Sequence, residues 1–220
     1  VTMKEVVIID GIRTAVGRRK GKLTYMRPDE LAATVLEKLI DRVGIEKGDV
    51  EDIILGCVSQ VGEQGGNIAR TAGLIAGFPT KVPGTTIDRQ CGSSQQAVHF
   101  AAQAIACGDM DIVIAGGVES MTRVPMMSNM GDAKPSKKLL EQYEIINQGL
   151  SAERIAEQWD LSREALDTFS VQSHERAFQA IAEGRFEKEI VPIEVTKEDG
   201  TTELLSIDEG PRAGTTLETL

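Results

Sequence analysis

The feature that most constrains the fold is an alternation of short β-rich runs with helical segments over the first 117 residues. The helical segment at 28–44 opens with Pro28 at its start, and its apolar residues recur at helical spacing. The segment at 67–77 has Asn67 as a possible N-cap and a glycine as a stop. This alternation predicts an α/β fold with a mostly parallel sheet that carries helices on its faces. The expected strands lie at 6–10, 52–58, 84–88 and 110–117, and the expected apolar face of the first helix is Leu31, Val35, Leu39 and Val43.

The character of the sequence changes near residues 118–120. An irregular, Met-rich stretch is followed by two helical segments, at 151–161 with Ser151 as its cap and at 162–186 with Ser162 as its cap. Runs at 189–195 and 201–207 then predict a β-hairpin. We therefore expect a core over 1–118, incomplete at its end, and a smaller α+β region over 119–220.

Composition excludes several classes of protein. A chain of 220 residues with 41% hydrophobic residues can bury a core without metal or disulfide support. A net charge of −10 argues against binding to nucleic acid or to an anionic membrane surface. The apolar runs are shorter than the roughly 20 residues of a membrane helix, and no signal-peptide core is present. Three cysteines without metal-ligand spacing predict no metal site, and we expect a cytoplasmic protein.

The stretch "TTIDRQCGSSQQAVHFAAQAIACG" places Cys91 where a β-rich run meets an Ala-rich helical segment. A thiol in the first turn of a helix faces unpaired backbone N–H groups and the positive end of the helix dipole, which favour its anionic form. The alternative is a small buried core residue, the commoner role of an internal cysteine. Cys57 and Cys107 lack the helix-start position and are interpreted as structural. The alanines all round the segment, with no charged face, predict a helix buried inside the fold.

A thiolate nucleophile needs a partner base, and the chain has two histidines. His99 lies eight residues along the same helical segment, roughly 12 Å from Cys91 at about 1.5 Å of rise per residue. His174 falls on a polar helical face, where a solvated histidine is the ordinary interpretation. The catalytic set of this chain is therefore expected to be incomplete.

Five motifs in order now identify a resemblance. "QCGSSQQAVHFAAQAI" resembles the nucleophile motif of thiolases, which cleave or form a carbon–carbon bond β to a coenzyme A thioester, and "IIDGIRTAVGR", "GGNIARTAGL", "AGGVESMTRVP" and "DEGPRAGTTLETL" resemble the family's other landmarks. The resemblance implies a catalytic domain of two similar βαβαβαββ halves with a coenzyme A-binding loop region inserted in the first. This chain resembles that first half plus most of the insertion. The second half, whose Gly-His-Pro motif supplies the base, would lie beyond Leu220.

The resemblance also implies roles for particular residues. Cys91 would accept the acyl group, with its own backbone N–H in the oxyanion hole. Arg212 and Thr219 match positions that contact the nucleotide end of coenzyme A, and Gln148 stands near a methionine that lines the family's acyl pocket. Coenzyme A and acyl-coenzyme A would be substrates rather than permanently bound cofactors, and a homodimer or homotetramer is expected. Gln148 in place of that methionine leaves the acyl chain length open. "CGSSQQA", which departs from the commoner glycine-containing form, and the basic "GRRKGKL" leave the subfamily open.

Several alternatives remain at this stage. The methionines at 121, 126, 127 and 130 are interpreted either as a pliable wall over an acyl chain or as gap-filling core residues. "GEQGGN" at 62–67 is a phosphate cradle or, more commonly, a turn before a helix, and the basic run at 13–22 is a phosphate contact or a solvated loop. The rival functions are a non-catalytic acyl-coenzyme A-binding or scaffold protein and, less well matched, a condensing enzyme of the ketosynthase type.

Overall fold

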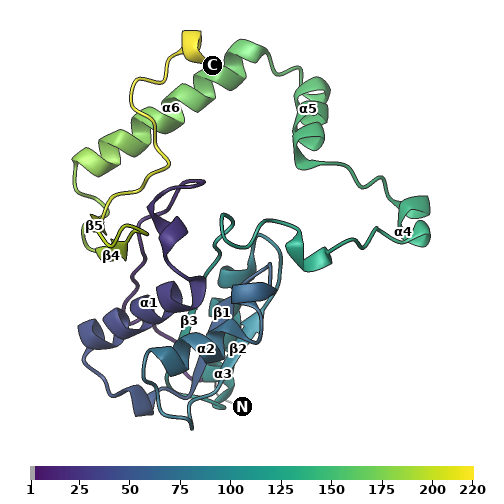
Figure 1. Ribbon diagram of the computed structural model, residues 1–220. Helices are drawn as coiled ribbons and strands as arrows, with labels where there is room; N and C mark the ends of the chain where they lie inside the picture. The colour runs from purple at the N-terminus through teal and green to yellow at the C-terminus, as the bar shows by residue number, and fades with distance from the viewer. Residues whose placement is uncertain (1–2) are drawn as a thin grey trace. The chain divides into compact units, whose positions relative to one another are not determined.

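The computed structural model describes residues 3–220, which form two compact units. The first unit runs to Gly131 and also contains Lys188–Glu209, and the second unit consists of Asp132–Glu187 and Gly210–Leu220. In chain order (Figure 1) the helices and strands are α1 (Pro28–Val43), β1 (Asp52–Gly56), α2 (Ile68–Ile75), β2 (Gly84–Ile87), α3 (Ser93–Cys107), β3 (Val113–Gly117), α4 (Lys137–Gln142), α5 (Gln148–Gln158), α6 (Arg163–Ala182), β4 (Ile193–Thr196) and β5 (Thr202–Leu205).

A parallel sheet of order β2-β1-β3 forms the centre of the first unit. Its central strand β1 pairs with β2 from Ile53↔Gly84 and with β3 from Asp52↔Val113. All five residues of β1 are buried, as expected for a central strand covered on both faces. The parallel α/β fold predicted from the alternating pattern is confirmed.

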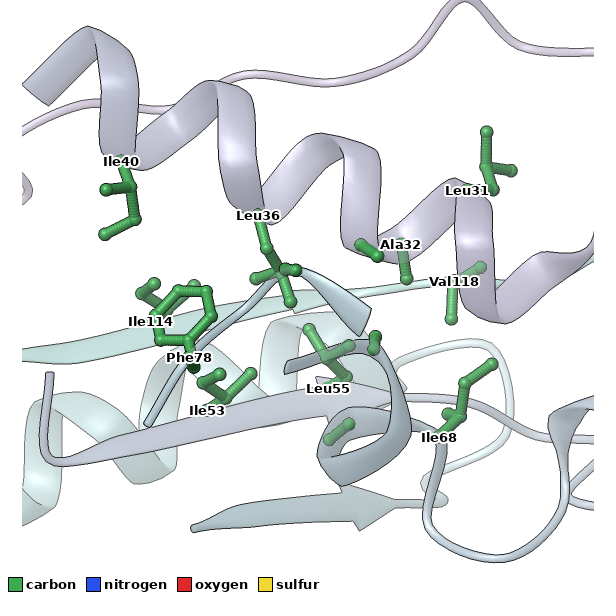
Figure 2. Packing of buried hydrophobic residues seen from close by; sticks show 14 of the residues in the cluster. Leu31, Ala32, Leu36, Ile40, Ile53, Leu55, Ile68, Phe78, Ile114 and Val118 are labelled. Atoms are coloured by element: carbon green, nitrogen blue, oxygen red, sulfur yellow. The ribbon is translucent and has the colours of Figure 1, made fainter. Parts of the chain in front are cut away.

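The two faces of this sheet carry different helices, and Figure 2 shows the packing of buried residues on the side of α1 and α2. Side chains alternate along a strand, so Ile53 and Leu55 point to one face and Ile54 to the other. Ile53 and Leu55 belong to the main core with residues of α1 and α2, whereas Ile54 packs with Ala97 and Ala101 of α3. The sheet therefore separates α1 and α2 from α3.

The first helix was predicted correctly, but its buried face is rotated from the expected one. The helix begins at Pro28, and Gly44 ends it in the left-handed conformation with φ 76°. Leu36 and Ile40, with Ala32 and Ala33, are the buried residues that follow Leu31, while the other three residues of the expected face are only half-buried. Contact with α2 orients the buried face of α1, whereas Val35 and Leu39 of the expected face line an open cavity of the first unit instead of a packed core.

The prediction of a strand at 6–10 is wrong. Val7, Ile8 and Ile9 are 67%, 81% and 69% exposed, and no described residue forms a strand ladder with them. A cavity of about 910 Å³ lies between the segment from Asp10 to Lys20, α1 and the edge of β3. An apolar β-rich run becomes a strand only where a neighbouring strand is within hydrogen-bonding distance, and none of the described strands pairs with this run.

The prediction that the Ala-rich helix is buried on all sides is also wrong for the described chain. Ser93, Ala97 and Ala101 are its buried residues, and they lie on the face against the sheet. Outside this face, Val98 and Phe100 are 39% and 41% exposed. Small side chains let the helix approach the sheet closely, but no layer of the described residues covers its outer face.

The region after Gly117 has the expected mixture of helices and a hairpin. Ser162 caps α6 by accepting a hydrogen bond from the Ala165 N–H, as predicted. The cap of α5 is Asn147 instead of Ser151, because the helix begins one turn earlier than the sequence pattern suggested. The hairpin β4-β5 is confirmed and groups with the first unit. The division into parts at 1–118 and 119–220 stays a prediction.

Candidate active site

Cys91 lies in a tight turn that joins β2 to α3. Gln90 has the left-handed φ of 47°, and its N–H donates to the Asp88 carboxylate at 2.7 Å. The hydroxyl of Ser93 accepts from the Arg89 N–H at 3.0 Å and donates to the Gln90 carbonyl at 2.7 Å. Ser93 is 5% exposed, so these bonds hold the turn from inside.

The Cys91 thiol is exposed immediately before Gly92, the N-cap of α3. The N–H groups of Gly92 and Ser93, which follow it, donate to the Arg89 and Gln90 carbonyls at 3.0 and 3.3 Å and close the turn just before the helix. The interpretation of Cys91 as a buried core residue is wrong. The position expected for a nucleophile at a helix opening is therefore present, one residue outside the cap.

The other two cysteines lie in different surroundings. Cys57 is buried just after β1, and burial, with the nearby Glu119 and Asp88 carboxylates, raises the pKa of its thiol to about 12. Cys107 is exposed at the opposite end of α3 and donates to the Ala104 carbonyl. Of the three thiols, Cys91 alone combines exposure with a helix start.

A carboxylate clamp connects the loops that follow β1 and β3. Glu119 accepts from the Val58 N–H at 2.8 Å, the Ser59 N–H at 3.3 Å and the Gln64 side-chain amide at 2.7 Å. Gln64 is fully buried, and its carbonyl accepts from the Ser120 N–H at 2.7 Å. The carboxyl ends of the two strands are thus fixed to each other on the edge of the sheet where Cys91 lies.

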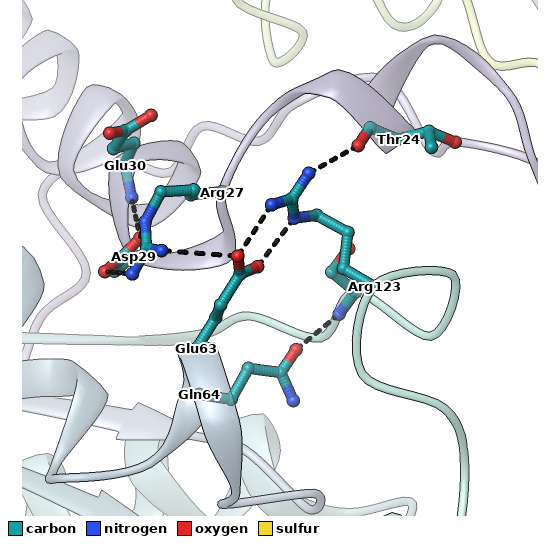
Figure 3. A network of polar contacts seen from close by, with 8 residues as sticks. Thr24, Arg27, Asp29, Glu30, Glu63, Gln64 and Arg123 are labelled. Carbon is teal, nitrogen blue, oxygen red and sulfur yellow. Dashed lines mark hydrogen bonds and ion pairs between the residues drawn. The ribbon is translucent and has the colours of Figure 1, made fainter.

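A second network, shown in Figure 3, extends this connection to the start of α1. Arg123 makes two bonds of 2.6 Å to Glu63 and a third, of 2.7 Å, to the Thr24 carbonyl. Arg27 bonds Glu63 at 3.2 Å and pairs with Asp29. Hydrogen bonding from Arg123 lowers the pKa of Glu63. Burial acts to raise the pKa of Asp29, but the bonds from Arg27 lower it overall.

Acidic residues of "DEGPR" hold the basic run at 13–22 in place. Arg13 bonds Asp208 at 2.7 Å and Glu189 at 2.7 Å, and the bond from Arg13 lowers the pKa of Asp208. Glu209 accepts from the backbone N–H groups of Arg18 and Lys22, both at 3.3 Å. The run is therefore partly an internal ion-pair site and not simply a solvated loop.

The residues matched to coenzyme A contacts all lie in the second unit. Arg212 is exposed and donates its backbone N–H to His174 Nδ1 at 3.2 Å. The Thr219 hydroxyl accepts from the Thr216 N–H at 3.0 Å and closes a capping box with that residue. Gln148 is exposed as the first residue of α5. Cys91 belongs to the first unit.

Neither histidine lies in the turn that carries Cys91. His99 is exposed on α3, and its place in the helix puts it two turns beyond the cap. His174 belongs to α6 of the second unit. Among the described residues of the first unit, no histidine other than His99 is present to act as a base.

The methionines after β3 are exposed, so their interpretation as core residues is wrong. Met121 and Met126, at 57% and 64% exposure, line the cavity of the first unit, whereas Met127 and Met130 do not. The "GEQGGN" stretch forms a short 3-10 turn whose Glu63 and Gln64 face protein partners, which confirms the turn interpretation.

Residues 6–220 match the family described as "Thiolase, N-terminal domain". The chain belongs to the thiolase family. It is 47% identical to a steroid 3-ketoacyl-CoA thiolase of Mycobacterium tuberculosis, in an alignment that covers 96% of this chain and 53% of the relative. A 3-ketoacyl-CoA thiolase of Bacillus subtilis is 42% identical, with 99% of this chain and 58% of the relative covered.

A solved structure agrees with these sequence relatives. The crystal structure of the Bacillus anthracis acetyl-CoA acetyltransferase superposes with a TM-score of 0.86 at 38% identity, covering 99% of this chain and 58% of that chain. This thiolase chain therefore spans about half the length of the relatives it matches. No described helix is both long and apolar enough to cross a lipid bilayer.

Sequence reasoning missed the polar residues that connect the loops of the site. Glu119 and Gln64 are 55 positions apart, and Glu63 and Arg123 are 60 apart. Glu119 and Arg123 lie in the motif "AGGVESMTRVP", and their partners Gln64 and Glu63 lie in the "GEQGGN" stretch, but nothing in the spacing shows which side chains meet. Such pairs become visible only when the parallel strands bring their following loops to one edge.

Proposed function

We propose that this chain carries the nucleophile of a thiolase that transfers acyl groups between Cys91 and coenzyme A. The observation that carries the proposal is the exposed Cys91 thiol at the start of α3, in a chain of the thiolase family. The Cys91 thiolate attacks the ketone of a 3-oxoacyl-coenzyme A, and the carbon–carbon bond breaks as the acetyl-coenzyme A enolate leaves and is protonated. A second coenzyme A then removes the shortened acyl group from the sulfur. The reverse sequence joins two acyl groups.

The proposal extends to the coenzyme A contacts. Arg212 and Thr219 are accessible in the second unit, and a guanidinium suits both phosphate and the face of a nucleobase. Gln148 is the proposed neighbour of the acyl chain. The base would come from the Gly-His-Pro motif that the family resemblance implies, since His99 lies two turns along α3 from the helix start. A homo-oligomer in the cytoplasm remains the accompanying expectation.

Alkylation of the three thiols tests the nucleophile. A low dose of iodoacetamide followed by peptide mass spectrometry should label Cys91 ahead of Cys107 and Cys57. Cys107 is the matched control, since it is an exposed thiol of the same helix at the end where the dipole disfavours an anion. Equal rates at Cys91 and Cys107 would show that exposure alone decides reactivity.

Acyl transfer itself is tested in the complete gene product. Incubation with acetyl-coenzyme A should leave an acetyl thioester on Cys91, and Cys91→Ala should form none while Cys107→Ala forms it normally. Binding of coenzyme A by calorimetry, without thiolysis of acetoacetyl-coenzyme A, would favour the scaffold function instead.

A further inference from the structure

The last residues of β1 and β3 are glycines, and the first turn of α3 lies directly against them. Gly56 and Gly117 are partners in the register of the two strands. A Cβ on Gly56 would lie 2.4 Å from the Ser93 carbonyl carbon and from the Ser94 nitrogen. A Cβ on Gly117 would lie 1.9 Å from the Ser94 hydroxyl oxygen and 2.8 Å from the Gly56 carbonyl oxygen. The first turn of α3 therefore lies so close to the two strands that a side chain at position 56 or 117 would overlap with it.

The part of α3 that contacts the two glycines is connected to Cys91 by a short stretch of backbone and by two hydrogen bonds. Two residues separate Ser94 from Cys91, and the Ser93 hydroxyl bonds both Arg89 and Gln90 on the other side of the cysteine. A displacement of the first helical turn must therefore move the Cys91 sulfur and its N–H group with it.

We propose that Gly56 and Gly117 are positioning residues for Cys91. Because these two residues have no side chains, the first turn of α3 lies close to the ends of β1 and β3. That distance determines the position of the Cys91 sulfur relative to the acyl group that it attacks. The proposal rests on the proposed function, because the quantity affected is the acylation of Cys91. Neither glycine touches the reacting atoms, so both act through the helix start.

The size of the displacement follows from the contacts. Ordinary contact of a Cβ begins near 3.4 Å, so a methyl group at position 56, facing backbone atoms at 2.4 Å, needs a movement of about 1 Å. At position 117 the Ser94 hydroxyl can rotate away, but the Gly56 carbonyl oxygen at 2.8 Å and the Ser94 Cβ at 3.0 Å remain. A misplacement of about 1 Å at a reacting group lowers the rate by roughly 100-fold.

The strand itself supplies a matched control. Gly116 precedes Gly117 in β3, and a Cβ there would meet only the Leu55 Cδ2 at an ordinary 3.7 Å. Gly116→Ala thus makes the same change of residue type in the same strand without reaching α3. A rescue is also available, since Ser94→Gly removes both side-chain atoms that a methyl at position 117 would meet.

The experiment measures acetylation of Cys91 by acetyl-coenzyme A in the complete gene product. In this step the Cys91 sulfur bonds the acetyl carbonyl carbon and the coenzyme A thiolate leaves. Quenched samples of wild type, Gly56→Ala, Gly117→Ala, Gly116→Ala and Gly117→Ala/Ser94→Gly are compared by intact mass, and the thermal midpoint of each is recorded. Coenzyme A affinity is measured alongside, because a positioning role lowers the acylation rate without weakening binding.

We expect Gly56→Ala and Gly117→Ala to acylate about 100-fold more slowly than Gly116→Ala, with coenzyme A affinity unchanged. Gly117→Ala/Ser94→Gly should recover part of the rate lost by Gly117→Ala. If Gly56→Ala does not fold, the comparison of Gly117→Ala with its rescue decides. Folded variants that acylate at the rate of Gly116→Ala overturn the positioning role alone, whereas a wild type that forms no thioester overturns the proposed function itself.

Discussion

Removal of the Arg123 guanidinium is the sharpest test of how the loops around Cys91 are held. Arg123→Met keeps most of the apolar stem but deletes three charge-assisted bonds, two to Glu63 and one to the Thr24 carbonyl. Both side chains of the pair are 27% exposed, so solvent screens the interaction only in part. Hydrogen bonds to charged groups contribute roughly 1.5–3 kcal/mol, and partial exposure reduces this to about 1–2 kcal/mol for the variant.

The effect of Arg123→Met on the unfolding free energy should depend on pH. The bonds from Arg123 lower the pKa of Glu63 in the folded protein, so the stabilisation is fully present above the unfolded value near 4.3 and is lost as the pH falls through the lower folded value. The difference in unfolding free energy between wild type and Arg123→Met should therefore be full at pH 7 and shrink below about pH 4.

Urea unfolding at several pH values provides the measurement, and Arg154→Met provides the control. Arg154 also pairs with Glu144 through two bonds, from Nη1 and Nη2 at 2.7 and 2.6 Å, but its side chain is 56% exposed. Its replacement should leave the unfolding midpoint unchanged. Equal losses for Arg123→Met at pH 7 and pH 3, or an equal effect of Arg154→Met, would show that the ion pair does not stabilise the loops.

Two further outcomes are expected. Asn147→Ala should reduce the helix content of α5 in far-UV circular dichroism by loss of its cap, worth about 1 kcal/mol, whereas Ser151→Ala should not, and the opposite order would restore Ser151 as the cap. Leu36→Ala should lower the unfolding free energy by about 2–5 kcal/mol in urea titration because Leu36 is 3% exposed between α1 and the sheet, and a loss below about 1 kcal/mol would contradict that packing.

The strands and helices that have partners within the chain were predictable from local patterns. The helix from Pro28 to its left-handed Gly44 follows from residues within one turn of each end, and the cap at Ser162 likewise depends on near neighbours. The strand expected at 6–10 was wrong because a strand also requires a distant partner. No local pattern reports whether such a partner is in reach.

In the candidate site, too, some features were predictable from the sequence and others depended on the tertiary structure. The sequence alone determined that Cys91 stands between a strand and a helix, and the family resemblance assigned its role. Only the tertiary structure decided that Cys57 is buried while Cys91 is exposed. It also showed that the first turn of α3 lies against the edge of the sheet at Gly56 and Gly117, where a side chain would not fit. Local propensity acts over a few residues. Exposure of a side chain and close approach of a helix to a strand depend on contacts between segments more than 20 positions apart, and tertiary packing determines those contacts.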